Sequence, residues 1–201
     1  MDHVQRQLSS SSSVGVAGGF GMNSSPPRRK KYVLIGSGTG GWLAVLIARR
    51  RPDLVAGIVG LSADPDFTED LIWPTLSQAD KDEIMTSQKG YKMLNWGSAV
   101  YPISKSLIED AKDNLVLRGG KGSLRIDCPV RLLHGLSDEE VPHRTAMALA
   151  DAIMGTDVVV TLLKGAKHMM DTEQDFDRMW GAVEEVLDAS SGFDLRSPAS
   201  G

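Results

Sequence analysis

The sequence predicts an α/β protein in which a mostly parallel sheet carries helices on both faces. Three observations support this prediction. Short runs of almost purely apolar residues recur along the chain, as expected of strands that are buried on both faces. Helical segments separate these runs, which is the order of β-α-β units. A glycine-dense turn joins the first apolar run to the first helix.

The first elements follow one another closely. Residues 32–35 form an apolar run that predicts a strand, and residues 41–50 predict a helix. Pro52 ends this helix, because proline lacks the backbone N–H that a helix interior needs. Residues 56–61 predict a second strand, which runs into the polar segment 62–65.

The second half of the chain repeats the alternation. Residues 128–133 and 158–163 predict a third and a fourth strand, residues 141–154 a helix between them, and residues 171–188 a closing amphipathic helix. The segment 66–126 separates the second and third strands and is too long for a simple crossover. It is mostly helical in pattern and polar, so we expect a helical cap insertion over the carboxyl edge of the sheet.

Composition indicates one folded domain with two different ends. Residues 1–31 are rich in serine and glycine and end in a basic block, so they bury too little apolar surface to offset the entropy of ordering. We expect them, and the tail 189–201, to be disordered around a domain of residues 32–188. The 201 residues are 41% hydrophobic and 24% charged, which is typical of a globular protein.

Several classes of function find no support in the composition. A net charge of -4 gives no reason to expect nucleic acid as a partner. The single cysteine, Cys128, excludes a disulfide within the chain and fits a reducing compartment. No apolar run approaches the roughly 20 residues of a membrane-spanning helix.

The glycine-dense turn has two interpretations. Gly36, Gly38 and Gly41 match G-x-G-x-x-G between a strand and a helix, the pattern of a dinucleotide-binding module. That pattern also requires an acid at the end of the next strand, where this chain has Leu61 and Ser62. Asp64 comes later than the expected position. Dinucleotide binding is therefore the less favoured alternative.

The other interpretation is a nucleophile elbow, the tight strand-to-helix turn that carries a catalytic side chain. Two distant segments favour it. Asp138 follows the third predicted strand, and His168 follows the fourth. A nucleophile elbow, then an acid, then a histidine, each after a strand, is the chain order of the α/β-hydrolases.

Residues 32 to about 188 resemble the later two-thirds of an α/β-hydrolase. They are most similar to the serine aminopeptidase-like branch that contains a mitochondrial palmitoyl-protein thioesterase, also an acyl-glucuronide esterase. The resemblance is carried by Gly40-Gly41-Trp42-Leu43, Cys128-Pro129-Val130-Arg131-Leu132-Leu133-His134-Gly135, Asp138, Val141-Pro142, Thr156-Asp157-Val158 and His168-Met169-Met170.

The resemblance implies a function and roles for individual residues. Asp138 would be the acid and His168 the base of a catalytic triad, and Thr39 would offer its backbone N–H to the oxyanion hole. The substrate would be an acyl ester or thioester, free or protein-bound, with neither a cofactor nor a metal. The location would be mitochondrial by resemblance, and cytoplasmic otherwise.

One departure from the family concerns the nucleophile. Gly38 stands where the family has its serine, and glycine has no side-chain atom to attack a carbonyl. Thr39 is a less favoured substitute, because a β-branched residue would sit on a strained turn, and Ser37 is a weaker one. We therefore expect impaired or absent catalysis. A non-catalytic homologue that binds a ligand or a partner is the alternative.

A second departure lies upstream of the elbow strand. Residues 1–31 lead directly into this strand, so we expect the first third of the family's fold to be absent and the elbow strand to lie at or near an edge of the sheet. Four other residues have more ordinary roles. Trp42 is expected to pack the first helix on the sheet and His134 to be structural, whereas Asp64 and Asp66 either cap a following helix or line the cleft.

Overall fold

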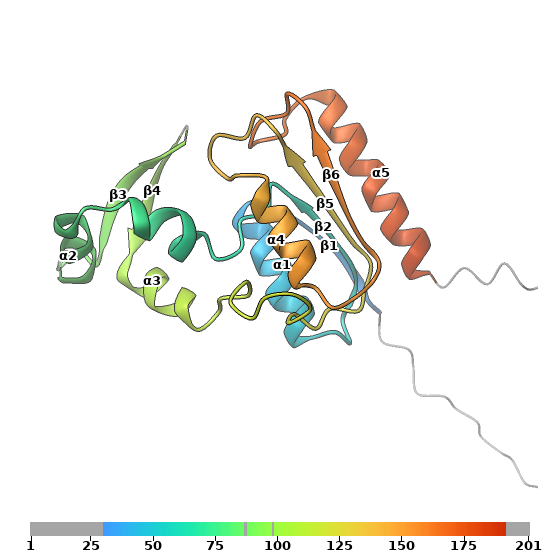
Figure 1. Ribbon diagram of the computed structural model, residues 1–201, viewed down its shortest axis with the longest axis horizontal. Coiled ribbons are helices and arrows are strands. Elements are labelled where there is room, and N and C mark those ends of the chain that lie inside the picture. Colours follow the sequence, from blue (N-terminus) through green and yellow to red (C-terminus); the bar gives the residue numbers. More distant parts are fainter. Residues whose placement is uncertain (1–29, 87, 98, 192–201) are drawn as a thin grey trace, which may run out of the picture.

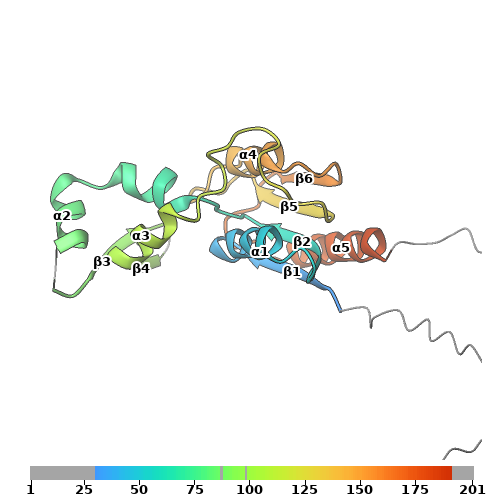
Figure 2. The ribbon, with the colours of Figure 1, turned by 90° about the horizontal axis from the view of Figure 1, so that it is seen from below.

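The computed structural model describes residues 30–86, 88–97 and 99–191. They form a body of sheet and helices with a separate lobe beside it (Figures 1 and 2). The expected disordered segments at the two ends lie almost entirely outside these residues. At the C-terminal end the last helix continues to Ser190, two residues beyond the expected end of the domain.

The body is a four-stranded, fully parallel sheet in the order β1-β2-β5-β6. Its strands are β1 (Tyr32–Ser37), β2 (Val55–Leu61), β5 (Val130–Gly135) and β6 (Val158–Leu163). Its helices are α1 (Thr39–Arg50), α4 (Arg144–Ala152) and α5 (Glu173–Ser190). Helices α1 and α4 cover one face and α5 covers the other (Figure 1). The predicted α/β class is confirmed.

Element boundaries differ slightly from the prediction. Strand β5 begins and ends two residues later than expected, so His134 lies within it. Helix α4 begins only at Arg144, because the preceding residues form the loop that contains Asp138. The register pairs the last residues of neighbouring strands, Ser37 with Leu61 and Gly135 with Leu163. The carboxyl ends therefore meet at one edge of the sheet.

Two hydrophobic cores flank the sheet. Beneath α1 and α4, the side chains of Val45, Ile58 and Leu149 are completely buried. Trp42 belongs to this core, as expected, and its indole Nε1–H donates to the carbonyl oxygen of Asn114 at 3.2 Å. Beneath α5, Val186 is completely buried. Each fully buried side chain of this kind contributes about 1.5–3 kcal/mol.

The insertion between β2 and β5 forms the lobe. It contains the helical turns η1 (Thr68–Ile72) and η2 (Trp73–Thr75), helix α2 (Gln78–Thr86), strands β3 (Tyr91–Trp96) and β4 (Ala99–Ser104), and helix α3 (Lys105–Lys112). It has a core of its own, made of Ile72, Ile84, Ile103 and Ile108. The antiparallel hairpin of β3 and β4 is an addition to the mainly helical insertion that the sequence predicted.

Strand β1 lies at an edge of the described sheet. Within the residues described, it pairs with β2 alone. Tyr32 and Ile35 on this strand are 59% and 50% exposed. The expectation that the elbow strand lies at an edge therefore matches the described part of the chain.

Candidate active site

A sharp turn at Gly38 joins β1 to α1. Gly38 has φ 52° and ψ -124°, in the left-handed region that favours glycine. The strand and the helix approach each other so closely that a Cβ on Gly36 would lie 2.2 Å from the carbonyl oxygen of Gly40. The chain therefore forms the tight strand-to-helix elbow that the sequence indicated.

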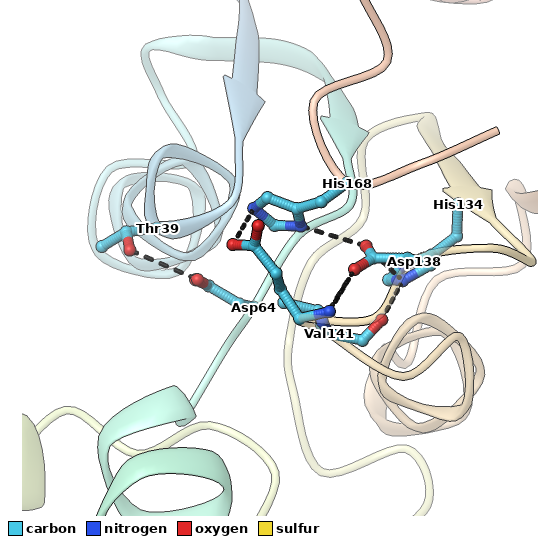
Figure 3. A network of polar contacts seen from close by, with 7 residues as sticks. Thr39, Asp64, His134, Asp138, Val141 and His168 are labelled. Carbon is cyan, nitrogen blue, oxygen red and sulfur yellow. Dashed lines mark hydrogen bonds and ion pairs between the residues drawn. The ribbon is translucent and has the colours of Figure 1, made fainter. Parts of the chain in front are cut away.

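Thr39 is the first residue of α1. N–H groups in the first turn of a helix have no acceptor within the helix, so they can bind a developing negative charge. The hydroxyl Oγ1 of Thr39 donates to Oδ2 of Asp64 at 3.4 Å (Figure 3). This side chain, considered above as a substitute nucleophile, is thus paired with a carboxylate.

Asp138 and His168 come together from the loops after β5 and β6. The ring nitrogen Nδ1 of His168 lies 3.0 Å from Oδ2 of Asp138 (Figure 3). The other oxygen, Oδ1, accepts the backbone N–H groups of Glu140 at 2.9 Å and Val141 at 2.8 Å. The Asp138 side chain is fully buried, whereas the imidazole of His168 is 17% exposed. The carboxylate is therefore fixed, and it orients the imidazole.

His134 supports this arrangement from within β5. Its Nε2 lies 2.9 Å from the carbonyl oxygen of Val141 and 3.3 Å from Oδ2 of Asp138. A carbonyl oxygen and a carboxylate oxygen can only accept a hydrogen bond, so Nε2 of His134 carries the proton. The side chain is completely buried, as the structural role expected for it requires.

The hydrogen bonds shift two pKa values in opposite directions. Burial alone would raise the pKa of Asp138, but the hydrogen bonds from His134, His168 and Val141 outweigh burial and hold it well below its usual range. The hydrogen bond to Asp138 raises the pKa of His168, against a smaller opposing effect of burial. Asp138 is thus a permanent carboxylate that makes the imidazole more basic.

The glycine at the elbow faces this pair directly. A Cβ built on Gly38 would lie 3.7 Å from Nε2 of His168 and 3.6 Å from Oδ2 of Asp64, both ordinary van der Waals distances. A side chain of serine size would therefore fit at this position and would reach the imidazole. The structure brings together the three predicted positions Gly38, Asp138 and His168.

Known proteins share this arrangement of the chain. No family model matches the sequence. The mitochondrial palmitoyl-protein thioesterase ABHD10 of Pongo abelii is 30% identical over 159 residues, which are 79% of this chain and 51% of that protein. A putative hydrolase from Agrobacterium vitis superimposes with a TM-score of 0.71 at 31% identity, covering 79% of this chain and 62% of that one. The chain belongs to the α/β-hydrolase superfamily.

A second solved structure agrees. The mouse α/β-hydrolase domain-containing protein 10 superimposes with a TM-score of 0.66 at 28% identity, covering 80% of this chain and 63% of that one. The chain spans about half the length of the curated relatives that it matches.

The sequence did not place Asp64 securely in the site. This residue follows β2 and is only 9% exposed, and its Oδ1 has no hydrogen-bond partner among the described residues. Burial raises the pKa of Asp64 to about 7, an effect that the charge of His168 only partly offsets. Asp64 was expected either to cap a helix or to line the cleft, and in the structure it lines the cleft.

Asp66 instead has a structural role. Its carboxylate accepts the backbone N–H groups of Val116 at 2.8 Å and Leu117 at 2.9 Å. These bonds fix the segment in which the chain returns from the insertion. Ser62 and Asp66 on either side of Asp64 have φ of 43° and 60°. Such values are uncommon for residues other than glycine, so no sequence pattern reveals this turn.

Glu140 is a site residue that the sequence did not predict. Its Oε2 lies 3.8 Å from Nε2 of His168. The signal was present in the sequence, because Glu139 and Glu140 directly follow Asp138. Only the turn that Asp138 closes decides which of these acids points at the histidine.

A cleft of about 440 Å³ lies between the sheet edge and the insertion. The polar groups of the site, among them Asp64, Glu140 and His168, form part of its lining, and apolar side chains form the rest. This apolar wall is made of Phe67, Ile72, Trp96, Tyr101, Pro102, Ile103, Leu107 and Met169. A mainly apolar cleft with a few polar groups is typical of a site for a small molecule with an apolar part.

Two further observations concern ligands. Among the described residues, no cluster of three or more His, Cys, Asp or Glu side chains could hold a metal ion, and no helix is long and apolar enough to cross a membrane.

The carboxylate of Asp64 lies beside the start of α1, where a dinucleotide module would place its phosphates. When this carboxyl group is ionised, its negative charge would repel a phosphate placed there.

Proposed function

We propose that this chain binds acyl esters or thioesters in the cleft and that Gly38 closes the serine route of hydrolysis. One observation carries this proposal. A Cβ at residue 38 would stand 3.7 Å from Nε2 of a histidine that a buried aspartate orients. The positions of residue 38, His168 and Asp138 thus match those of a serine-hydrolase triad from which the attacking atom is absent.

Each part of the site has a role in this proposal. Asp138 holds the tautomer of His168 in which Nδ1 carries the proton, so that Nε2 faces the acyl group. The backbone N–H of Thr39 stabilises the oxygen of the acyl carbonyl when it becomes negative. The acyl chain lies along the apolar wall, where its burial supplies most of the binding free energy.

Gly38 limits what this site can do. Without a hydroxyl at this position no acyl-enzyme intermediate forms there. Loss of a triad nucleophile leaves only the catalysis that binding and oxyanion stabilisation supply, which is many orders of magnitude weaker. We therefore propose ligand binding with turnover far below that of a serine hydrolase.

The relatives support the choice of ligand. Those that match this chain are named as palmitoyl-protein thioesterases, and the mouse structure belongs to the same group. Their names describe enzymes that remove a long acyl chain from a protein thioester. The apolar wall of the cleft is suited to such a chain.

Calorimetry with a non-hydrolysable thioether analogue of a long-chain acyl thioester tests the proposal. We expect saturable binding by the wild-type protein. Tyr101→Asp places a charge on the apolar wall and should weaken binding at least tenfold. Tyr91→Asp is the matched control, because both tyrosines are 44% exposed and Tyr91 does not line the cleft. No binding, or equal binding by both variants, would refute the proposal.

A non-catalytic role is favoured by the same glycine. In that case the protein would bind the analogue but would not accelerate hydrolysis of the matching thioester. Release of free thiol, measured with and without the protein, separates binding alone from slow turnover.

The names of the relatives include a mitochondrial location, and we propose the same location for this chain. Expression of the full chain with a fluorescent protein at its C-terminus tests this. We expect the fluorescence to coincide with a mitochondrial marker, and a diffuse signal through the cytoplasm would contradict the proposal.

A further inference from the structure

Asp64 is a buried acid that lines the cleft and has no role in the catalytic triad. Asp138 accepts two backbone N–H groups and orients His168, and Asp66 holds the end of the insertion. Asp64 does neither. Its side-chain oxygen Oδ2 accepts a hydrogen bond from the hydroxyl of Thr39. The other oxygen, Oδ1, is buried and has no hydrogen-bond partner among the described residues. A buried polar atom without a partner is costly, so a ligand-binding role is the natural explanation.

The position of this carboxyl group is specific. Oδ2 of Asp64 and Nε2 of His168 lie 3.6 and 3.7 Å from the place that the Cβ of a residue-38 side chain would take. Because residue 38 is glycine, the space between them is open to a small polar molecule. A water there would have a carboxylate and an imidazole as hydrogen-bonding partners, which meets the usual minimum of two.

Given the acyl-binding role proposed for the cleft, we propose that Asp64 is a catalytic residue. Its carboxylate is the general base for a water that attacks the bound acyl carbonyl directly, above Gly38. His168, when it is protonated at Nε2 as well as at Nδ1, is an imidazolium held by Asp138 and acts as the general acid. The reaction is thus a single-displacement hydrolysis with no covalent intermediate.

The atoms balance in two steps. The water oxygen forms a bond to the carbonyl carbon while one of its protons moves to the carboxylate of Asp64, and the carbonyl electron pair moves to the oxygen beside the N–H of Thr39. This intermediate then collapses, the bond from carbon to sulfur or oxygen breaks, and the leaving group takes a proton from His168. Return of one proton from Asp64 to His168 through solvent restores the starting state.

The electrostatics of the two groups suit these roles. A general base is most effective when its pKa lies near the working pH, and burial raises the pKa of Asp64 to about 7. Asp138 raises the pKa of His168, which favours the imidazolium form.

The local backbone also points to function rather than to packing. Ser62 and Asp66, two residues before and two residues after Asp64, both have positive φ. Backbone strain of this kind concentrates at functional sites, where the surrounding structure enforces it. Here it turns the Asp64 carboxyl toward the elbow, while Asp66 is tied to the end of the insertion.

The test measures thiol release from an octanoyl thioester of N-acetylcysteamine by wild type, Asp64→Asn and Asp188→Asn. Asp188 is an exposed acid at the far end of α5, so this control removes the same charge outside the site. We expect a slow wild-type rate, a fall of about 10²–10⁴-fold for Asp64→Asn, as is typical for loss of a general base, and no change for Asp188→Asn. The dissociation constant of the matching thioether should be the same for all three proteins.

Each other outcome is decisive. If Asp64→Asn hydrolyses as fast as wild type while the thioether binds, the general-base role is wrong and the proposed binding function stands. If the thioether does not bind, the general-base role and the proposed binding function are both wrong. A wild-type rate equal to the buffer rate also overturns the role. In a single turnover in ¹⁸O-water, label should enter only the released acid, and label found in the peptide that contains Asp64 would instead show that Asp64 attacks the substrate.

Discussion

Asp64 and His168 come from loops after non-adjacent strands, β2 and β6, yet they face the same point above Gly38. Oδ2 of Asp64 lies 3.6 Å and Nε2 of His168 lies 3.7 Å from the position of a Cβ on this glycine. In the relatives' fold this point belongs to the nucleophile. In this chain it is bounded instead by an acid and an imidazole, and most of the expected behaviour follows from this difference.

The link between Asp138 and His168 predicts the titration of the histidine. Replacing Asp138 with Asn removes the negative charge beside Nδ1, so the pKa of His168 should fall toward or below the ordinary value of about 6.5. NMR titration of the imidazole measures this shift. Glu139→Gln is the control, because it removes the same charge from the next residue, which is exposed. An unchanged His168 titration in Asp138→Asn would contradict the geometry.

The pKa of Asp64 predicts a dependence of stability on pH. Because its pKa is raised from 3.8 to about 7, the folded state binds a proton between these values that the unfolded state releases. The free energy of unfolding should therefore fall as the pH rises, by at most about 1.4 kcal/mol per pH unit from this residue. Asp64→Asn should lack this contribution.

Urea unfolding between pH 4.5 and 6 measures the difference between the two proteins. His168 and Asp138 are the charged groups that act on Asp64. The lowered pKa of Asp138 changes stability only as the pH falls below about 4, and the raised pKa of His168 changes it only above about 6.5. If the free energy of unfolding changes with pH by the same amount in wild type and Asp64→Asn between pH 4.5 and 6, the raised pKa of Asp64 is refuted.

The cap of α5 predicts a stability effect that leaves the site unchanged. The side chain of Thr172 accepts the backbone N–H of Asp175 at 3.2 Å, and the Asp175 carboxylate accepts the N–H of Thr172 at 3.3 Å. Thr172→Ala should lower the free energy of unfolding by about 1 kcal/mol. Thr172→Ser should keep most of the stability. Equal losses in the two variants would show that the hydroxyl is not the cause.

The backbone of Gly38 predicts a cost for any side chain there. Its φ of 52° lies in a region that L-residues rarely adopt, so Gly38→Ala should lower the free energy of unfolding by about 1–3 kcal/mol. No neighbouring atom is close enough to add a clash. Chemical denaturation measures the loss, and an alanine variant as stable as wild type would show that the turn is relaxed.

The sequence was sufficient for the features that depend on local pattern and chain order. The four apolar runs predicted the parallel strands, and the order of Asp138 and His168 after successive strands placed both at one edge of the sheet. The hairpin in the insertion was missed because Tyr91–Trp96 and Ala99–Ser104 are half-exposed and mixed in composition. The pair Gly97-Ser98 between them is a hairpin signal.

Asp64 and Glu140 could not be placed in the same way. The direction of the Asp64 side chain depends on a turn with positive φ at Ser62, which no propensity predicts. Glu140 is oriented because its own backbone N–H is bound by Asp138. Both positions result from tertiary contacts between loops of different strands, and such contacts leave no periodic pattern in the sequence.

The most direct test restores the attacking atom. Purified wild type, Gly38→Ser and Gly38→Ala are treated with a fluorophosphonate probe, which labels an activated serine covalently. The account predicts labelling of Gly38→Ser alone, at residue 38 and dependent on His168, since the serine would stand beside the oriented imidazole. A folded Gly38→Ser protein that stays unlabelled, or labelling of Gly38→Ala to the same extent, would contradict the claim that only the nucleophile is missing from the triad.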